Sequence, residues 1–281
     1  MAGRIRAIKS RIGNIENIAQ ITKAMHTIAM TKVMRMKRRL KQSRPFISSL
    51  EEFIADLLGQ VGPEMERDPL TVGNGSNEVG VLVLNADRGL CGRYKADLNR
   101  RAAELISGGG KLLTGGEKSR AFFVRQGIEP LRSYNYLYDT PSWDAASAIA
   151  EDAIELYLDG EYGRLVLVYM RFVSDLSQRL VVEDLLPVGL EPRTSDILIE
   201  PDLPALLAAA IPFYLRAKVY AAILETKASE DAIRRQAMKS ATDNAEELLK
   251  GLTRAYNKAR QQAITREIAD IIGGAEALRG G

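Results

Sequence analysis

A chain of 281 residues is long enough for one substantial domain with long extensions, or for two modest domains. Its single cysteine, Cys91, excludes an intrachain disulfide framework, and with His26 as the only histidine a zinc cluster is excluded as well. The longest apolar run, residues 205–213, contains Pro212 and falls short of the roughly 20 residues that a membrane-spanning helix needs. We therefore expect a protein that is not inserted in a membrane and that folds in a reducing compartment.

The net charge of +3 conceals an uneven distribution along the chain. Residues 1–45 carry twelve lysines and arginines against one acid, Glu16, whereas the rest of the chain is acidic overall. A basic arm on an acidic body predicts an acidic or polyanionic partner. The arm also resembles a mitochondrial presequence in composition, but its helical pattern is too long and too regular for a removable leader.

Residues 1–44 contain no proline and predict a long helix. Apolar or small residues recur at alternating steps of three and four, which is the heptad spacing of a coiled-coil seam. A second stripe widens the apolar face in the middle, so we expect more than one neighbour there. Pro45 predicts a bend, with the pattern resuming over residues 46–58. The seam consists of Ile5, Ile8, Ile12, Ile15, Ala19, Thr22, His26, Ala29, Val33, Met36 and Leu40, and the second stripe of Ile18, Ile21, Met25 and Ile28.

The middle of the chain has a different pattern. Residues 79–84 and 165–169 are continuous apolar runs, which are typical of buried strands. Strands that alternate with helices predict βαβ units and a small, mostly parallel sheet. The other predicted elements are strands at 111–114 and 178–186 and helices at 100–106, 118–126 and 143–158. Segments 59–77 and 187–204, rich in glycine or proline, are the predicted linkers.

From Phe213 to the end the chain contains no proline, and a second long helix is predicted. Sixty helical residues would span roughly 90 Å, so the apolar stripe needs a partner along most of its length. We predict that the two terminal helices pair antiparallel. The stripe consists of Ile233, Ala237, Ala241, Ala245, Leu248, Leu252, Ala255 and Ala259, extended by Ile264, Ile268, Ile271 and Ala275.

The predicted fold class is therefore α/β: a long antiparallel coiled coil of the N- and C-terminal helices plus a small, mostly parallel Rossmann-like α/β domain. The predicted division is an N-terminal shaft helix over residues 1–58, a central α/β foot domain over 78–187 and a C-terminal shaft helix over 205–281.

The sequence predicts no catalytic, cofactor or metal site. Glycine-rich segments 108–114 and 115–119 lack the spacing of a phosphate-binding loop, so a polar turn is the better interpretation. Segment 85–92 follows a strand, where α/β sheets often bind ligands, and contains Cys91. Because His26 lies in the terminal helix, no cysteine–histidine pair is available, and we interpret the segment as a glycine-supported turn.

Three blocks carry a family resemblance. They are Arg4-Ile-Arg-Ala-Ile-Lys-Ser-Arg-Ile12 through Ile21-Thr-Lys-Ala-Met25 with Ser43-Arg-Pro45, then Asp87-Arg-Gly-Leu-Cys-Gly92, and finally Ala228-Ser-Glu230 through the terminal Ile264 to Ala277. Together they resemble the gamma subunits of F-type ATP synthases over essentially the whole chain. Two departures are Arg93-Tyr94-Lys95 after the glycine turn and Met30-Thr31 before Lys32. The regulatory cysteine pair of the chloroplast type is absent.

The resemblance implies a non-catalytic rotor shaft with no cofactor. In that family the terminal helices turn inside the hexamer of alpha and beta subunits, and the α/β foot binds the epsilon subunit and the membrane c-subunit ring. Proton flow turns the ring, and the beta subunits perform the catalysis. The implied location is peripheral, on the cytoplasmic face of the bacterial plasma membrane. The implied contacts with beta are Lys23, Met25, Arg260, Gln261, Thr265 and Glu267, and those toward the ring and epsilon are Tyr220 and Glu225.

Three other classes compete with this interpretation. A basic coiled-coil nucleic-acid-binding protein is the main alternative, because a basic helix binds polyanions readily. The bases are distributed over three helix faces beside a full apolar seam, which favours a partner helix with solvated sides. A generic coiled-coil scaffold and a nucleotide-binding enzyme are the remaining alternatives.

Overall fold

The computed structural model describes residues 2–62, 68–194, 198–200 and 202–279. Two very long helices, α1 (Ala2–Gly59) and α6 (Leu203–Arg279), enclose the rest of the chain in sequence. The chain divides into two compact units, so that each long helix contributes to both. We call Ala29–Arg234 the α/β unit and the combination of Met1–Ile28 with Arg235–Gly281 the coil unit. The three-part division predicted from the sequence stays a prediction.

A five-stranded sheet forms the centre of the α/β unit, with strand order β3-β2-β1-β4-β5. β1, β2, β3 and β4 are parallel to one another, and only β5 runs antiparallel, against β4. The predicted small, mostly parallel sheet is thus confirmed. The strands are β1 (Val79–Leu84), β2 (Lys111–Gly115), β3 (Arg132–Tyr134), β4 (Arg164–Phe172) and β5 (Gln178–Leu186), and the short helices are α2 (Pro69–Val72), α3 (Tyr94–Ile106), α4 (Glu117–Arg125) and α5 (Trp143–Leu158).

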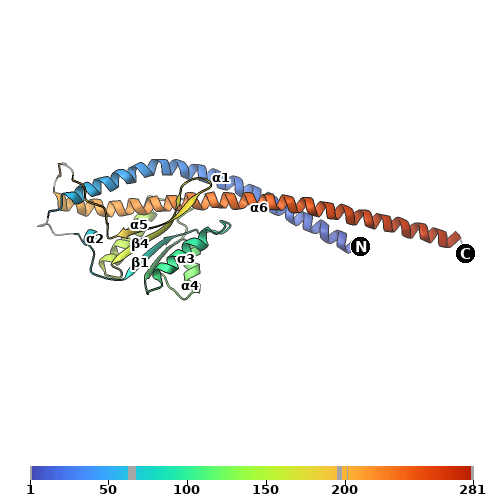
Figure 1. Cartoon of the computed structure of the whole chain (residues 1–281), viewed down its shortest axis with the longest axis horizontal. Coiled ribbons are helices and arrows are strands. Elements are labelled where there is room, and N and C mark those ends of the chain that lie inside the picture. The colour runs from blue at the N-terminus through green and yellow to red at the C-terminus, as the bar shows by residue number, and fades with distance from the viewer. Residues whose placement is uncertain (1, 63–67, 195–197, 201, 280–281) are drawn as a thin grey trace. The chain divides into compact units, whose positions relative to one another are not determined.

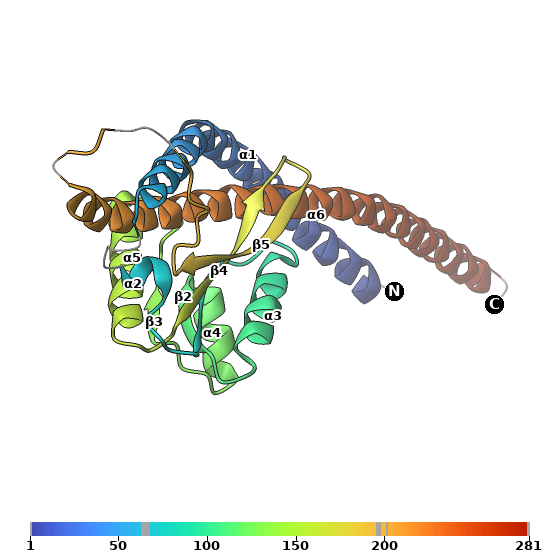
Figure 2. The same ribbon diagram turned by 60° about the vertical axis from the view of Figure 1, so that its left-hand side comes forward.

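Alternation along the strands separates two cores, as the pleat of a sheet requires. Leu82 and Leu84 of β1 point into the core that contains α5 and the α/β-unit parts of α1 and α6. Val81 and Val83 point into the other core, which α3 and α4 cover. The sheet is therefore buried on both faces, which explains why its strands read as continuous apolar runs. Figure 2 shows α3 and α4 together on one side of the strands.

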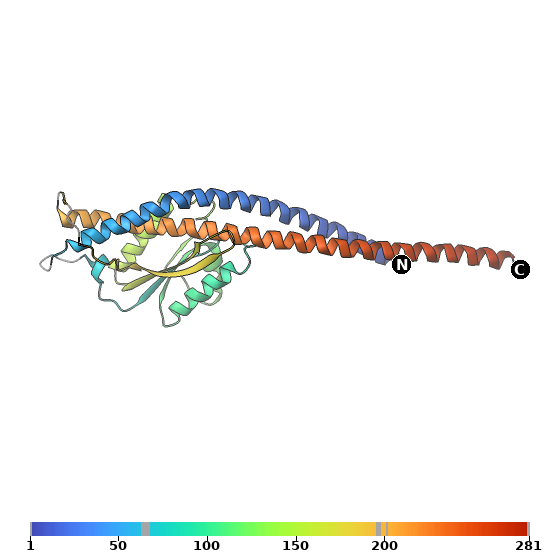
Figure 3. The same cartoon turned by 45° about the horizontal axis from the view of Figure 1, so that its top comes forward.

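In the α/β unit, α1 and α6 run side by side in opposite directions (Figures 1 and 3). The ion pairs Arg44–Glu225 and Glu51–Lys218 give the register, because one residue number rises as the other falls. Both helices continue through a proline, Pro45 in α1 and Pro212 in α6. The helices predicted over residues 1–58 and 205–281 each include their proline, and the bend predicted at Pro45 does not end α1. A proline inside a helix costs ~3 kcal/mol. Around Pro212 the burial of Ile211 and Leu215 offsets that cost, whereas Pro45 and Phe46 are exposed.

The coil unit consists of the start of α1 and the end of α6. The hydroxyl oxygens of Thr22 and Thr242 lie 2.8 Å apart and form a buried hydrogen bond between the two helices. The predicted antiparallel pairing is confirmed, with the start of α1 and the end of α6 at the same end of this unit (Figure 1). The predicted α1 seam is also confirmed, since Ile5, Ile8 and the other seam residues are less exposed than their neighbours.

The seam of α6 is partly wrong as predicted. Leu248 is 56% exposed and Ala255 is exposed, whereas Leu249 and Tyr256 turn toward the partner helix. After Ala245 the observed seam takes a step of four rather than three, and two adjacent leucines made both steps plausible. The observed seam is Met238, Thr242, Ala245, Leu249, Leu252, Tyr256, Ala259 and Ala263, and residues 264–275 are all exposed.

By length and composition alone, α6 passes the test for a helix that could cross a membrane. However, 44% of its most apolar 18-residue window is buried within the structure. The core helix of a protein that never enters a membrane passes the same test, so this finding is weak evidence for insertion.

Candidate functional site

The strand order reverses between β1 and β4, and this is where open α/β sheets bind ligands, outside the carboxyl ends of the strands. In this chain α6 occupies that position. The Ser229 hydroxyl donates to the Met170 carbonyl at 3.0 Å, where β4 nears its end. The Tyr94 hydroxyl, at the start of α3, donates to the Thr226 carbonyl at 3.2 Å. The sheet thus holds a helix of its own chain where related folds hold a ligand.

Four charged residues of α6 are buried at this position. Lys227 Nζ lies 3.1 Å from Asp231 Oδ1 and 3.3 Å from Glu230 Oε2. Arg234 Nη1 lies 2.8 Å from the same Asp231 oxygen, and Nη2 pairs with Glu230. Two positive and two negative charges balance, and burial raises the pKa of Asp231 above its usual value. All four charges belong to α6, so they compensate one another within the helix, and removing one member would leave an uncompensated buried charge.

The buried ion cluster was missed from the sequence, although a signal was present. Lys227, Glu230, Asp231 and Arg234 fall at helical spacings of three and four, the spacing of neighbours on one helix face. Charges at such spacing are usually read as a solvated face. Arg234 Nη2 also donates to the Gly89 carbonyl at 3.4 Å, which ties the cluster to the loop after β1.

A second contact point joins α1, α6 and β4. The Arg44 guanidinium makes two hydrogen bonds to the Glu225 carboxylate, at 2.8 and 3.0 Å. Glu225 also accepts from the Phe172 backbone N–H at 2.8 Å, and Arg44 donates to the Phe172 carbonyl. The Glu225 side chain is only 8% exposed, so its carboxylate is used inside the α/β unit. Its assignment to the ring and epsilon side stays a prediction.

The glycine turn after β1 packs against α6 as well. Leu90 adopts a φ of 63° and Gly92 a φ of 56°. A side chain at Gly92 would lie 3.6 Å from Ile233 of α6, at ordinary contact distance, so the positive φ is what favours glycine there. Cys91 is 1% exposed, and burial raises the pKa of its thiol, with Glu230 adding to the effect. The thiol is therefore packed as a core residue and is not activated.

The glycine-rich segment 115–119 serves close packing instead of phosphate binding. A Cβ on Gly116, whose φ is 111°, would lie 2.4 Å from the Asn85 carbonyl oxygen. The buried Ser119 hydroxyl donates to Asn99 at 2.6 Å, and the Asn85 amide donates to the same oxygen at 2.8 Å. These polar groups satisfy one another. Within the described part of the chain, no group of acidic, histidine and cysteine residues could hold a metal ion.

The sequence Arg93-Tyr94-Lys95, which differs from the usual pattern of the resembled family, contributes one residue to the core. Tyr94 is fully buried, and burial raises the pKa of its phenol well above the usual value. Its ring fills the core between α3 and the sheet, while Arg93 and Lys95 on either side are exposed. The tyrosine thus fastens α3 to α6, and the two bases add positive charge to the surface beside the turn.

The residues predicted to meet beta all lie in the coil unit and form two groups. Met25 is half-buried and Lys23 is exposed, close to Thr22 in the seam. The second group begins eighteen residues beyond Thr242, so the two groups lie ~27 Å apart along α6. The structure does not bring them together as one site, and their contacts with beta stay a prediction. The second group, all exposed, is Arg260, Gln261, Thr265 and Glu267.

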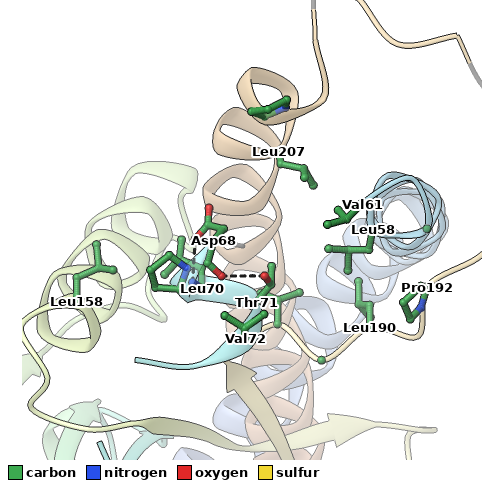
Figure 4. A pocket seen from close by; sticks show the side chains of 15 residues that line it. Leu58, Val61, Asp68, Leu70, Thr71, Val72, Leu158, Leu190, Pro192 and Leu207 are labelled. Carbon is green, nitrogen blue, oxygen red and sulfur yellow. Dashed lines mark hydrogen bonds between the residues drawn. The ribbon is translucent and has the colours of Figure 1, made fainter. Parts of the chain in front are cut away.

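A groove of about 980 Å³ lies among the end of α1, α2 and the start of α6. Figure 4 shows its mostly apolar lining, with Leu58, Leu70 and Leu207 among the labelled side chains. Among the described lining residues Asp68 alone is charged, and its carboxylate accepts from the Leu70 N–H at 2.8 Å to cap α2. The polar group therefore has a structural partner, and no convergent set of polar side chains marks a ligand site.

Comparisons with known proteins point to one family. The chain matches the ATP synthase family model over residues 4–278. It is 37% identical to the ATP synthase gamma chain of Moorella thermoacetica, covering 98% of this chain and 99% of that one. It is also 37% identical to the gamma chain of Chloroflexus aurantiacus, covering 97% and 98%. None of these matches supports a nucleic-acid-binding protein.

Solved structures give the same fold. A chain from the OSCP/F1/c-ring structure of the Euglena gracilis mitochondrial ATP synthase superposes with a TM-score of 0.73, at 21% identity, over 100% of this chain and 96% of that one. A chain from the central stalk and c-ring structure of the Tetrahymena thermophila enzyme superposes with a TM-score of 0.63, at 23% identity, over 79% and 99%.

Proposed function

This chain belongs to the family of ATP synthase gamma chains, and from that premise we propose how its structure performs the work of a rotor. It is a central-stalk subunit of the F-type ATP synthase and part of a membrane-associated complex. It is itself non-catalytic, because catalysis belongs to the beta subunits of the assembled complex. The expectation of a rotor shaft is confirmed at this level, and the named contacts below are proposals.

One observation carries the proposal: α6 is held at the carboxyl ends of the strands by contacts with several other elements. Ser229 binds the Met170 carbonyl, Glu225 binds the Phe172 N–H and the Arg44 guanidinium, and Arg234 binds the Gly89 carbonyl. The rest of the α/β unit can turn about α6 only by breaking these contacts. A torque applied to the α/β unit therefore enters α6, which continues unbroken to Arg279. Where related folds hold a ligand, this sheet holds a helix of its own chain. We call the contacts of Glu225, Ser229 and Arg234 with β4 and with the loop after β1 the clamp.

The coil unit is the part that meets the catalytic hexamer of alpha and beta subunits. Beyond Ala263 the end of α6 exposes four isoleucines, and an apolar sleeve inside the hexamer would cover them. Basic side chains such as Lys23 and Arg260 would face acidic loops of beta. The exposed isoleucines are Ile264, Ile268, Ile271 and Ile272.

The α/β unit faces the epsilon subunit and the membrane c-subunit ring, which deliver the torque of proton flow. The complex then lies on the cytoplasmic face of the bacterial plasma membrane, with this chain held there by other subunits and not inserted.

The test is reconstitution of the complex in vesicles with and without this chain. With it, we expect the chain to co-purify with alpha, beta and epsilon, and ATP hydrolysis to drive proton pumping. Without it, the alpha–beta hexamer should hydrolyse ATP without pumping. Proton pumping by the complex that lacks this chain would contradict the proposal.

A further inference from the structure

A groove with aromatic walls lies on the surface of the α/β unit, away from the crevice that holds α6. It encloses about 340 Å³ between α1, α6 and the start of α5. Trp143 and Tyr220 belong to its lining, and the Phe213 ring lies 5.4 Å from Trp143 and 6.2 Å from Phe46. We call this the aromatic groove. Its lining residues are Arg39, Gln42, Ser43, Phe46, Ile47, Trp143, Ala217, Tyr220 and Leu224.

The aromatic side chains are held in place although they are accessible. Phe46 is 49% exposed and Phe213 is 40% exposed, yet they stack edge to face. The loop before Trp143 is fixed because Arg39 donates to the Pro141 carbonyl at 3.2 Å and Ser142 caps α5. Rigid aromatic side chains in a preformed groove lose little conformational entropy on binding, which is typical of a binding surface.

The shape of the groove fits a helix. Its long walls are two antiparallel helix faces, with α1 contributing residues at steps of three and four from Arg39 to Ile47. α6 contributes Ala217, Tyr220 and Leu224 at the same spacing, and the small side chain of Ala217 lets a third helix approach closely. Apolar residues of an incoming amphipathic helix would insert along such a groove.

The charges around the groove indicate which sign of charge a partner would carry. The lining contains Arg39 and no carboxylate. Arg35, Arg38 and Lys41 on the same helix are exposed, and none of them forms an ion pair within the described residues. An acidic partner is favoured over a basic one by these uncompensated charges.

We propose that the aromatic groove binds an acidic amphipathic helix of a partner protein. Apolar side chains of that helix lie between Phe46 and Trp143, and its carboxylates face Arg39 and Arg38. This goes beyond the proposed function, which places Tyr220 on the ring and epsilon side but assigns the groove no partner helix and gives Phe46, Trp143 and Arg39 no part.

The single tryptophan of the chain, Trp143, reports occupancy directly. The full-length chain is titrated with a 15-residue synthetic helix that carries leucines at steps of three and four and glutamates on its flanks. We expect a saturable blue shift of the emission. A matched peptide with lysines in place of the glutamates should bind about tenfold more weakly or worse.

Three variants keep the proposal falsifiable. Phe46→Ser, in the groove lining, and Phe213→Ser, whose ring packs against Phe46 and Trp143 of that lining, should each weaken binding of the acidic peptide about tenfold. Phe53→Ser is the matched control, because Phe53 is also an exposed phenylalanine of α1, 40% exposed, but is neither a lining residue nor stacked on one. Circular dichroism checks that each variant is folded.

Equal binding of the acidic and basic peptides, or equal affinity in the Phe46, Phe213 and Phe53 variants, would overturn the proposal. An emission shift that depends on the concentration of the chain alone would overturn it too, by showing a second copy in the groove. Because the assay uses the isolated chain, its failure leaves the reconstitution test of the rotor unaffected.

Discussion

The two compact units are stabilised in different ways. The α/β unit buries large side chains completely, such as Tyr94, Phe123 and Leu82, on both faces of its sheet. The coil unit buries few side chains among the described residues, and most of them are as small as those of Thr22 and Ala245. Hydrophobic stabilisation scales with buried apolar area, so the α/β unit is the more strongly stabilised of the two. The coil unit leaves a long face exposed, and on that face we have proposed that partner subunits bind.

The largest effect is expected from Ala245→Pro, in the seam of the coil unit. Proline removes a backbone hydrogen bond and clashes with the preceding turn, at a cost of ~3 kcal/mol or more. The α/β unit should still fold, and ATP synthesis in reconstituted vesicles, normalised to assembled complex, should be severely reduced.

The control for Ala245→Pro is Cys91→Ser. The Cys91 thiol is a packed core group to which we assign no chemical role, so this change should leave ATP synthesis nearly unchanged. Full activity of the proline variant would contradict the account of the helix as a shaft, and so would loss of activity in an assembled serine variant.

The second effect concerns the clamp. Arg234→Gln leaves Glu230 and Asp231 with Lys227 as the only base, and removing one partner of a buried pair costs about 3–5 kcal/mol. We expect a lower midpoint of thermal unfolding and a loss of ATP-driven proton pumping that exceeds the loss of hydrolysis.

The matched control is Lys239→Gln, which breaks an ion pair with Asp243 whose two side chains are 61% and 52% exposed. Exposed helix pairs contribute about 0.5 kcal/mol or less, so this variant should behave like the parent. Equal thermal shifts in the two variants would show that burial of the cluster does not matter.

A smaller effect is expected from Glu225→Gln. The amide keeps an acceptor for the Phe172 N–H but loses the charge that faces Arg44, which is itself half exposed. We expect a loss of about 1–2 kcal/mol in the free energy of unfolding, measured by urea denaturation. An unchanged midpoint would mean that Glu225 is not a structural contact, and would favour its predicted place on the ring side.

The smallest expected effect distinguishes the two leucines that could belong to the seam of α6. Leu249→Ala should destabilise the coil unit by about 1 kcal/mol, whereas Leu248→Ala should change it by about 0.5 kcal/mol or less, because Leu248 is 56% exposed. Thermal melts followed by circular dichroism at 222 nm measure both. The reverse order would restore the seam predicted from the sequence.

The contrast between the units also explains what could be predicted from the sequence. The isoleucines of α1 gave an unambiguous seam, and the apolar runs of β1 and β4 gave the sheet. The α6 seam was predicted less well because alanines and adjacent leucines fit two registers. β3 was missed because Arg132–Tyr134 is short and polar.

The clamp could not be predicted from local patterns. The pairing of Arg234 with Gly89 joins residues far apart in the sequence, and periodicity carries no information about such contacts. The residues predicted to meet partner subunits have the same limit, since the exposed side chains of Lys23 and Glu267 form no hydrogen bond or ion pair within the described residues that would distinguish them.

The filled crevice at the end of β1 and β4 has a consequence for regulation. A domain of this fold that binds a nucleotide alternates between occupied and empty states, and its conformation then follows the concentration of that nucleotide. Here the place is taken permanently by Thr226 and Ser229 of the same chain. A ligand could enter this position only by displacing those contacts, so a change in the ATP or ADP concentration meets no open crevice here on which it could act.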